Sequence, residues 1–223
     1  MRSRRKKNLD ARLEKCRDYL LDWECGEHNY KEAVKSPNYI DLKSVFGNDN
    51  PIEIEVGCGK GKFACEIAKR NPDVNFIAIE KIDNVIVTAC ESAKAEGIKN
   101  LRFICCPAEF LQYFFPDGSV RRIYLNFSCP YPKNSYANNR LTSRKFLEIY
   151  RAILSEDGEI HQKTDNMHFF EYSIEQLSDF GYTIKNISLD LHNSDFKENI
   201  VTEYEAKFSS MGYPIYRLEA YLK

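Results

Sequence analysis

The chain has 223 residues, a length that suits one α/β domain with additional elements, and a 43% hydrophobic share that supports a substantial core. No apolar run approaches the ~20 residues that cross a bilayer. The basic start, Met1 to Lys7, is not followed by the apolar segment of a secretory signal. We therefore expect a cytoplasmic protein without membrane association.

The eight cysteines are scattered along the chain, without a C-x-x-C pair, and the four histidines do not cluster with them. This spacing does not support a structural zinc site, so we expect no metal. Reduced thiols that pack as small apolar groups are the better interpretation, and they again point to the cytosol.

The net charge of -1 excludes a chain that is basic throughout, but residues 1–7 carry a block of arginines and lysines. Such a block attracts phosphates, and its alternative is a solvated, disordered tail, which the residues alone favour. Helical spacing follows from Asp10 to Trp23. We expect residues 1–45 to form a basic N-terminal arm and helix, and residues 46–223 to form the main domain.

Strand-like and helix-like runs alternate through the main domain, which predicts an α/β fold with a mostly parallel sheet of about seven strands and helices on both faces. The expected strands are Ile52–Val56, Val74–Ile79, Leu101–Cys105, Arg122–Phe127, Glu159–Lys163, Tyr182–Asp190 and Pro214–Leu222. The expected helices are Lys62–Arg70, Asn84–Glu96, Thr142–Leu154 and Phe169–Phe180.

A glycine loop follows the first of these strands, with glycines at 57, 59 and 61. Glycine lets the chain turn tightly and lets a ligand approach the backbone at the start of a helix. The dinucleotide fingerprint G-x-G-x-x-G would need its last glycine at Lys62. The observed G-x-G-x-G, with Glu55 before it, instead resembles the S-adenosylmethionine loop of Rossmann-like class I methyltransferases. An ordinary strand-to-helix turn is the alternative.

An acidic residue, Glu80, ends the second strand, where a carboxylate can accept hydrogen bonds from both ribose hydroxyls. Enzymes that use nicotinamide dinucleotides share this feature. Glu80 therefore indicates a nucleoside ligand without identifying it.

Later motifs are more specific. They are Ile123 to Lys133, Gly158 to Asn166, Asp190 to Ser194 and Thr202 to Glu205. Together with Gly47 to Pro51 and the glycine loop, they resemble the bacterial tRNA (guanine-N7-)-methyltransferase family from about Phe46 to Tyr221. The resemblance implies transfer of a methyl group from S-adenosylmethionine to N7 of a guanosine in the tRNA variable loop.

The resemblance also assigns residues by position. Those implied for the cofactor are Glu55, Gly57, Gly59, Gly61, Glu80, Pro107 and Cys129, with Cys129 at the catalytic position. Those implied for the RNA or its guanine are Lys133, Asp165, Thr202, Glu203, Tyr204 and Glu205.

These residue types suit guanine, whose N–H donors match a carboxylate and whose ring matches a tyrosine, while a lysine suits a phosphate. Without the resemblance, Asp165 is better interpreted as a helix N-cap. The segment Thr202 to Glu205 is then better interpreted as a solvated loop beside a strand.

The sequence departs from the family pattern S-D-P-W-P-K, because it has Ser128-Cys-Pro-Tyr-Pro-Lys133. Cys129 thus replaces an aspartate, Pro107 replaces an acid, and residues 134–139 lack the usual positive charge. Guanine N7 has a free lone pair and needs no deprotonation, so alignment supplies much of the rate. A carboxylate would stabilise the charge that develops on the purine better than a neutral thiol.

Three functions follow from these features: an active tRNA methyltransferase, a catalytically weakened paralogue that binds S-adenosylmethionine or RNA, and a small-molecule methyltransferase. We expect tRNA as the partner, and either a monomer or a homodimer.

Overall fold

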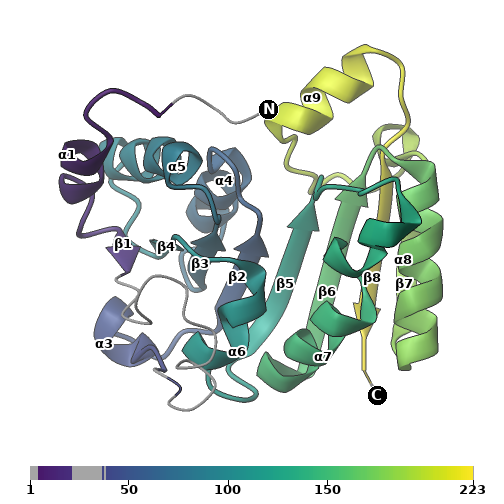
Figure 1. Cartoon of the computed structure of the whole chain (residues 1–223), viewed down its shortest axis with the longest axis horizontal. Helices are drawn as coiled ribbons and strands as arrows, with labels where there is room; N and C mark the ends of the chain where they lie inside the picture. Colours follow the sequence, from purple (N-terminus) through teal and green to yellow (C-terminus); the bar gives the residue numbers. More distant parts are fainter. Residues whose placement is uncertain (1–4, 22–36, 38, 223) are drawn as a thin grey trace. The chain divides into compact units, whose positions relative to one another are not determined.

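The computed structural model describes residues 5–21, 37 and 39–222, and its contacts divide the chain into two compact units, Met1–Pro116 and Asp117–Lys223 (Figure 1). These described residues form eight strands, one more than the sequence predicts. No helix within the same ranges is long and apolar enough to cross a membrane.

The first unit contains a parallel sheet with the strand order β1-β4-β3-β2. Its strands are β1 (Leu20–Leu21), β2 (Ile52–Val56), β3 (Asn75–Ile79) and β4 (Leu101–Ile104). Every residue of β2 and β3 is buried. The nearly continuous apolar run of β3 predicts this for a parallel strand, whereas β2 also buries the two acids Glu53 and Glu55. The expected strands of this unit are confirmed, and β1 is an addition.

The first unit contains the two helices that the sequence predicts, α4 (Lys62–Arg70) and α5 (Asp83–Ala95). It also contains three short elements that the sequence does not predict, which are α3 (Leu42–Phe46), the 3-10 turn η1 (Ala108–Phe110) and α6 (Leu111–Phe114). α4 and α5 contact each other and the strands β3 and β4. The buried side chains of α4, among them Phe63 and Ala68, face this core.

The helix predicted from Asp10 to Trp23 is wrong in its length, because α1 covers only Leu9–Glu14. The chain then turns, with the amide of Tyr19 donating to the carbonyl of Cys16 at 2.8 Å. Leu20 and Leu21 pair in parallel with β4, which gives the edge of that sheet a partner. Trp23 lies outside the described residues.

The described part of the basic N-terminal block contacts α5. The Lys6 amide donates to Asn84 at 2.6 Å. The Arg12 guanidinium, in α1, binds the Glu91 carboxylate through two bonds of 2.7 and 2.6 Å. Lys6 is therefore part of the first unit, which contradicts a wholly solvated tail for the described residues.

The second unit has the strand order β5-β6-β8-β7, with β5 and β6 parallel and β8 antiparallel to both of its neighbours. Its strands are β5 (Val120–Asn126), β6 (Leu154–Thr164), β7 (Thr183–Ser188) and β8 (Tyr216–Tyr221). Its helices are η2 (Asn134–Asn139), α7 (Arg144–Ile153), α8 (Met167–Phe180), η3 (Leu191–Asn193) and α9 (Glu203–Ser210). The predicted strands and the helices α7 and α8 are confirmed, whereas α9 is a helix that we did not expect.

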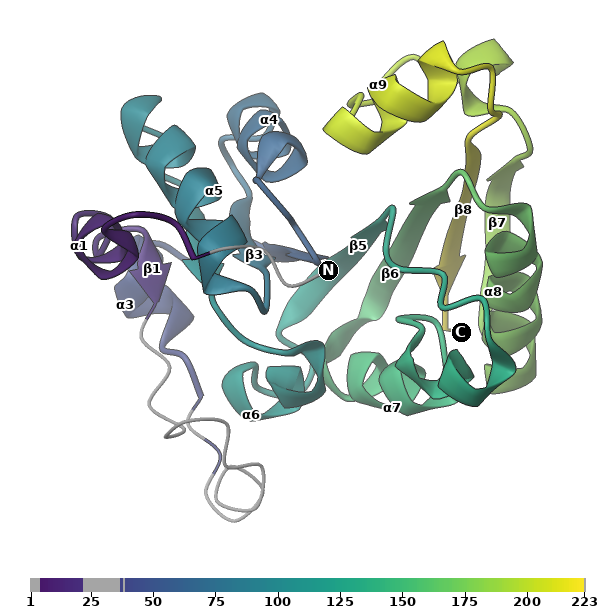
Figure 2. The ribbon, with the colours of Figure 1, turned by 45° about the horizontal axis from the view of Figure 1, so that its top comes forward.

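α8 packs against β6, β7 and β8, and α9 lies beyond the arrowheads of β5 and β6 in both views (Figures 1 and 2). The carboxyl ends of parallel strands are where open α/β sheets bind their ligands. The second unit therefore places α9 at the functional edge of β5 and β6.

Gly61 is the position of the glycine loop where a side chain has no room. Its φ is 80°, and an added Cβ would lie 2.5 Å from the Cβ of Ala89 in α5. We expect Gly61→Ala to lower the free energy of unfolding by about 2–4 kcal/mol, from left-handed backbone strain plus overpacking. Urea denaturation followed by circular dichroism measures this loss.

The matched control is Gly59→Ala, since Gly59 has a φ of 56° and open space where its Cβ would lie. Its free energy of unfolding should fall only by the cost of left-handed backbone strain, about 1–2 kcal/mol. Equal losses for the two variants would contradict the contact with Ala89.

Candidate functional site

The glycine loop connects β2 to α4 and is held against the end of β3. The amides of Gly57 and Cys58 both donate to the carbonyl of Ile79, at 2.8 and 2.9 Å. A Cβ built on Gly57 or Gly59 would meet nothing within 4 Å, so open space lies beside the loop. The loop is thus ordered by its neighbours while its backbone stays accessible to a ligand.

Two carboxylates accompany this loop. Glu80 accepts hydrogen bonds from the amides of Gly59, at 3.2 Å, and Ile82, at 3.1 Å. Glu55 is buried near the end of β2. A carboxylate fixed by backbone amides and an open glycine loop fit an adenosyl ligand, which carries ribose hydroxyls and a cationic amino acid group. Pro107 precedes η1 and is half-buried in the same unit.

In the second unit, the segment from Phe127 to Lys133 is held in an irregular path by Arg140. The Arg140 guanidinium donates to the carbonyls of Pro130 and Tyr131, each at 3.0 Å, and lies 4.3 Å from the ring centre of Tyr172. Phe127 and Tyr131 adopt positive φ values of 50° and 41°. A buried Arg140 therefore fixes the backbone of this segment.

Arg140 is a residue whose role the sequence did not reveal. Cys129 and Lys133 project from the segment as exposed side chains. The segment thus presents a thiol and an ammonium from a fixed backbone.

Asp165 follows the last residue of β6, directly before α8. The N-cap of α8 is Asn166, whose side chain accepts from the amide of Phe169 at 2.8 Å. The N-cap interpretation of Asp165 is therefore wrong by one residue, and capping does not engage its half-buried carboxylate.

The segment Thr202 to Glu205 begins a helix, so the solvated-loop interpretation is also wrong. Thr202 is the N-cap of α9 and forms a capping box with Glu205. Glu203 and Tyr204 are exposed, whereas Glu205 is 0% exposed. The pattern T-x-x-E is itself a signal for a helix start, and it could have identified α9 from the sequence.

Lys163 in β6 holds this helix start in place. Its buried ammonium donates to the Glu205 carboxylate at 2.7 Å, to the Ile200 carbonyl at 2.8 Å and to the Asn199 side chain at 3.0 Å. Asn199 in turn donates to Glu205. The three donors of the ammonium are thus all used, and Glu205 is engaged inside the protein.

The Lys163 backbone also connects to the segment of Cys129. Its carbonyl accepts from the Phe127 amide at 2.8 Å, and Asp165 is two residues further along the chain. Lys163 therefore connects the Cys129 segment, Asp165 and the start of α9, which are the three parts of the substrate side.

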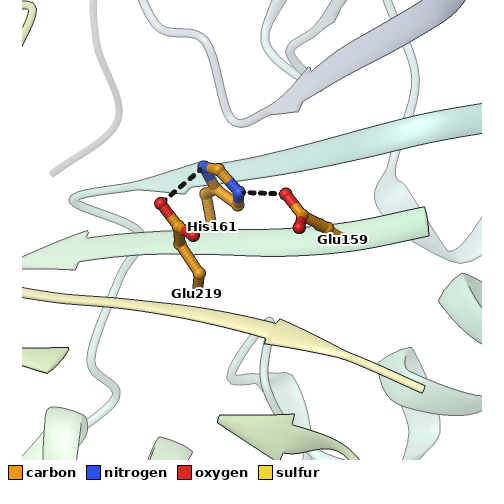
Figure 3. Close-up of side chains that lie close together, drawn as sticks. All are labelled: Glu159, His161 and Glu219. Carbon is orange, nitrogen blue, oxygen red and sulfur yellow. Dashed lines mark hydrogen bonds and ion pairs between the residues drawn. The ribbon is translucent and has the colours of Figure 1, made fainter. Parts of the chain in front are cut away.

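Elsewhere in the second unit, Glu159, His161 and Glu219 bring metal-ligating side chains together (Figure 3). The His161 ring lies between the two carboxylates, with 2.8 Å from Nε2 to Glu159 and 3.9 Å from Nδ1 to Glu219. The carboxylates already face cations, because Glu159 binds Lys185 and Glu219 binds Arg217. This arrangement is a charge network between strands, and nothing in it indicates a vacant metal site.

The charge network predicts a pH dependence of stability. Burial, and then the nearby Arg122 charge, lower the pKa of His161 from 6.5 to about 4. The unfolded chain therefore binds a proton on this residue before the folded chain does, and stability falls as pH falls from 6.5 to 4. We expect a loss on the order of 2 kcal/mol in urea denaturation across this window.

His161→Gln is the control, because glutamine keeps a donor toward Glu159 without titrating. It should flatten the profile between pH 6.5 and 4.5. Although burial opposes the shift, hydrogen bonds from Lys185 and His161 lower the pKa of Glu159 from 4.5 to about 2, so its own contribution is lost below this window. An unchanged slope in His161→Gln would refute the assignment.

The buried ion pair of Lys163 predicts a large stability effect. Lys163→Met removes the ammonium from the buried Glu205 carboxylate and leaves it with Asn199 and with His192, whose Nε2 lies 3.1 Å away. Loss of the buried partner should cost about 3–5 kcal/mol in the free energy of unfolding. The double variant Lys163→Met with Glu205→Leu should recover most of this loss in the same urea titration.

Lys43→Met is the matched control, since Lys43 forms an ion pair with Asp49 at the same distance of 2.7 Å but on the surface. It should change stability little. Comparable losses for Lys163→Met and Lys43→Met would show that burial does not matter at this pair.

Comparisons with known proteins identify the family of this chain. A family model described as a putative methyltransferase matches residues 49–218. A tRNA (guanine-N(7)-)-methyltransferase of Bacillus velezensis is 53% identical over 79% of this chain and 81% of its own length. A protein of the same name from Listeria monocytogenes is 51% identical over 84% of this chain and 88% of its own length.

Solved structures support the fold. The 16S rRNA methyltransferase KamB aligns with a TM-score of 0.62 at 15% identity, covering 83% of this chain and 95% of its own. A 30S ribosomal A1408 methyltransferase from an uncultured bacterium aligns with a TM-score of 0.57, also at 15% identity, covering 82% and 92%. The fold is therefore the Rossmann-like α/β fold of class I methyltransferases, and the chain belongs to the tRNA (guanine-N7-)-methyltransferase family.

Proposed function

We propose that this chain transfers a methyl group from S-adenosylmethionine to N7 of a guanosine in the tRNA variable loop. The observation that carries the proposal is the identity of 53% to a relative of that name, over 81% of the relative's length. The glycine loop, Asp165 and the start of α9 fall within residues 49–218, which the family model matches. A small-molecule substrate is disfavoured, because the relatives that match most of this chain are named for a reaction on tRNA.

The first unit supplies the cofactor side of this reaction. S-adenosylmethionine brings an electrophilic methyl group on a sulfonium when it is bound. Glu80 accepts the ribose hydroxyls, Glu55 faces the cationic amino acid group, and the backbone at Gly57 and Gly59 permits close approach. Gly61 is the N-cap of α4. Pro107 occupies the position after the third predicted strand where the family usually has an acidic residue.

The second unit supplies the guanine side. Asp165 accepts hydrogen bonds from the N–H donors of the base, Lys133 binds a phosphate and Tyr204 stacks on a ring. Thr202 and Glu205 act through the structure, because they fix the start of α9 on which Glu203 and Tyr204 stand. Asp165, Lys133 and Tyr204 are thus the direct contacts.

A catalytically weakened paralogue is the second candidate, and Cys129 is the observation that favours it. The N7 lone pair attacks without loss of a proton, so the chain needs to orient the base and stabilise the positive charge that develops. A fixed carboxylate would do the latter, and the exposed thiol of Cys129 carries no matching charge.

We also propose that residues 1–45 serve as the basic arm and helix of this enzyme and residues 46–223 as its methyltransferase domain. A cytoplasmic location is consistent with the cysteines of the described residues, all of which are free thiols. Analytical sedimentation would distinguish a monomer from a homodimer.

Labelled S-adenosylmethionine and unmodified bulk tRNA test the function, with mapping of 7-methylguanosine as the readout. If the missing carboxylate limits the reaction, Cys129→Asp should raise kcat about tenfold or more, because one well-placed electrostatic group contributes on that order or above. The KM for S-adenosylmethionine should change little.

Cys129→Ser is the matched control, since it replaces the thiol with another neutral group and should leave kcat near the wild-type value. Equal rates for the aspartate and serine variants would contradict the charge argument. Absence of 7-methylguanosine with wild type, despite cofactor binding in calorimetry, would refute the active-enzyme proposal and support the weakened paralogue.

A further inference from the structure

A row of aromatic rings runs along α9 from the segment of Cys129. Phe127 and Tyr204 are nearly parallel, with centroids 6.5 Å apart and an angle of 18°. Tyr204 and Phe208 repeat this geometry at 6.5 Å and 17°. Tyr213 meets Phe208 edge-on at 6.2 Å. We call these four residues the α9 aromatic row.

The row leaves large ring surfaces in contact with solvent. Tyr204 is 58% exposed and Tyr213 is 51% exposed. Single exposed aromatic residues are common, but neighbouring rings that expose a shared apolar surface mark a binding site more often than chance. This surface begins beside Ser128 and Cys129 and continues away from them along the helix.

Hydrogen bonds within the second unit hold the backbone that carries the first two rings. Tyr204 follows the capping box of Thr202 and Glu205, and Glu205 is fixed by the buried ammonium of Lys163. The Phe127 amide is bonded to the carbonyl of the same lysine. Rings held by such contacts lose little conformational entropy on binding, which favours a flat partner.

A cation accompanies the rings. The Lys207 ammonium lies 5.3 Å from the centre of the Phe208 ring, and the Lys207 side chain is exposed. An aromatic surface beside a lysine matches a nucleotide, whose base stacks while its phosphate meets the ammonium.

We propose that the α9 aromatic row binds an unpaired nucleobase next to the target guanine in the RNA, with Tyr213 as its stacking surface and the nearly perpendicular Phe208 ring beside it. The inference rests on the proposed function and extends it to a second nucleotide site. Recognition by stacking is tolerant of base identity, so the site adds affinity and orientation without reading the sequence.

A second copy of the chain suits this surface less well. A stable interface buries roughly 800 Å² on each partner. A whole aromatic side chain offers only 150–250 Å². Two tyrosines that are about half exposed therefore provide on the order of 200 Å², which is enough for a base and too little for a stable dimer.

Tyr213 is the position to test, because it is the ring of the row furthest along the chain from Cys129. A tRNA carrying 2-aminopurine immediately 5′ or 3′ of the target guanine reports stacking through quenched fluorescence. We expect wild type to quench one of the two probes. Tyr213→Leu should abolish that quenching and raise the Kd for tRNA about 5- to 100-fold, as expected for the loss of one base–aromatic stack.

Tyr213→Phe is the matched control, since it keeps the ring and should retain both quenching and affinity. Cofactor binding in calorimetry reports that each variant is folded. If Tyr213→Leu keeps the quenching and the affinity of wild type, this inference is overturned. Methylation of bulk tRNA by wild type would leave the proposed function intact in that case.

Failure of wild type to bind or methylate tRNA would instead remove the proposed function, and this site with it. Sedimentation tests the remaining outcome, which is that the row joins two copies of the chain. A wild-type dimer that becomes a monomer in Tyr213→Leu, with no change in the 2-aminopurine signal, would show that the row joins two copies and would overturn the nucleobase site.

Discussion

The buried contact between Lys163 and Glu205 is the interaction on which the substrate side depends. A lysine ammonium inside a protein is costly unless each of its protons is used, and here three acceptors use them. Two of those acceptors lie in the segment that leads into α9 and the third lies in its first turn. The ammonium therefore fixes a helix start on the end of a strand, where packing alone would leave two exposed turns poorly held.

We infer that the chain keeps this charged pair for the placement that it gives to α9, because stability alone does not require it. Replacing a buried ion pair with apolar residues of similar volume is often neutral or stabilising. Such a replacement would lose the directional hydrogen bonds between Lys163 in β6 and Glu205 in the first turn of α9. These bonds fix the start of α9 and therefore the position of Tyr204. Since attack by guanine N7 requires no general base, placement of the base is the main contribution that the second unit makes to the rate.

The sequence predicts the local features well and the distant ones poorly. β2 and α4 occur at the predicted residues, because a short run of β-branched residues, three glycines and an amphipathic helix are local signals. The helix expected to Trp23 ends at Glu14, since Leu20 and Leu21 pair with a strand that is far along the chain. Likewise, T-x-x-E signals a helix start, but the burial of Glu205 depends on a lysine 42 residues away.

Arg140 bears on the question that Cys129 raises, because it fixes the segment in which this cysteine lies. The guanidinium holds the segment through backbone carbonyls of Pro130 and Tyr131, so the path of the chain does not depend on which side chain occupies position 129. A cysteine at position 129, where the family has an aspartate, therefore removes a charge and leaves the backbone geometry in place. The cost of that exchange falls on the stabilisation of charge in the transition state and not on the alignment of the base. The side-chain contacts of Lys163 and Arg140 do not involve the side chain at position 129, so the start of α9 and the backbone of the Cys129 segment are held without it.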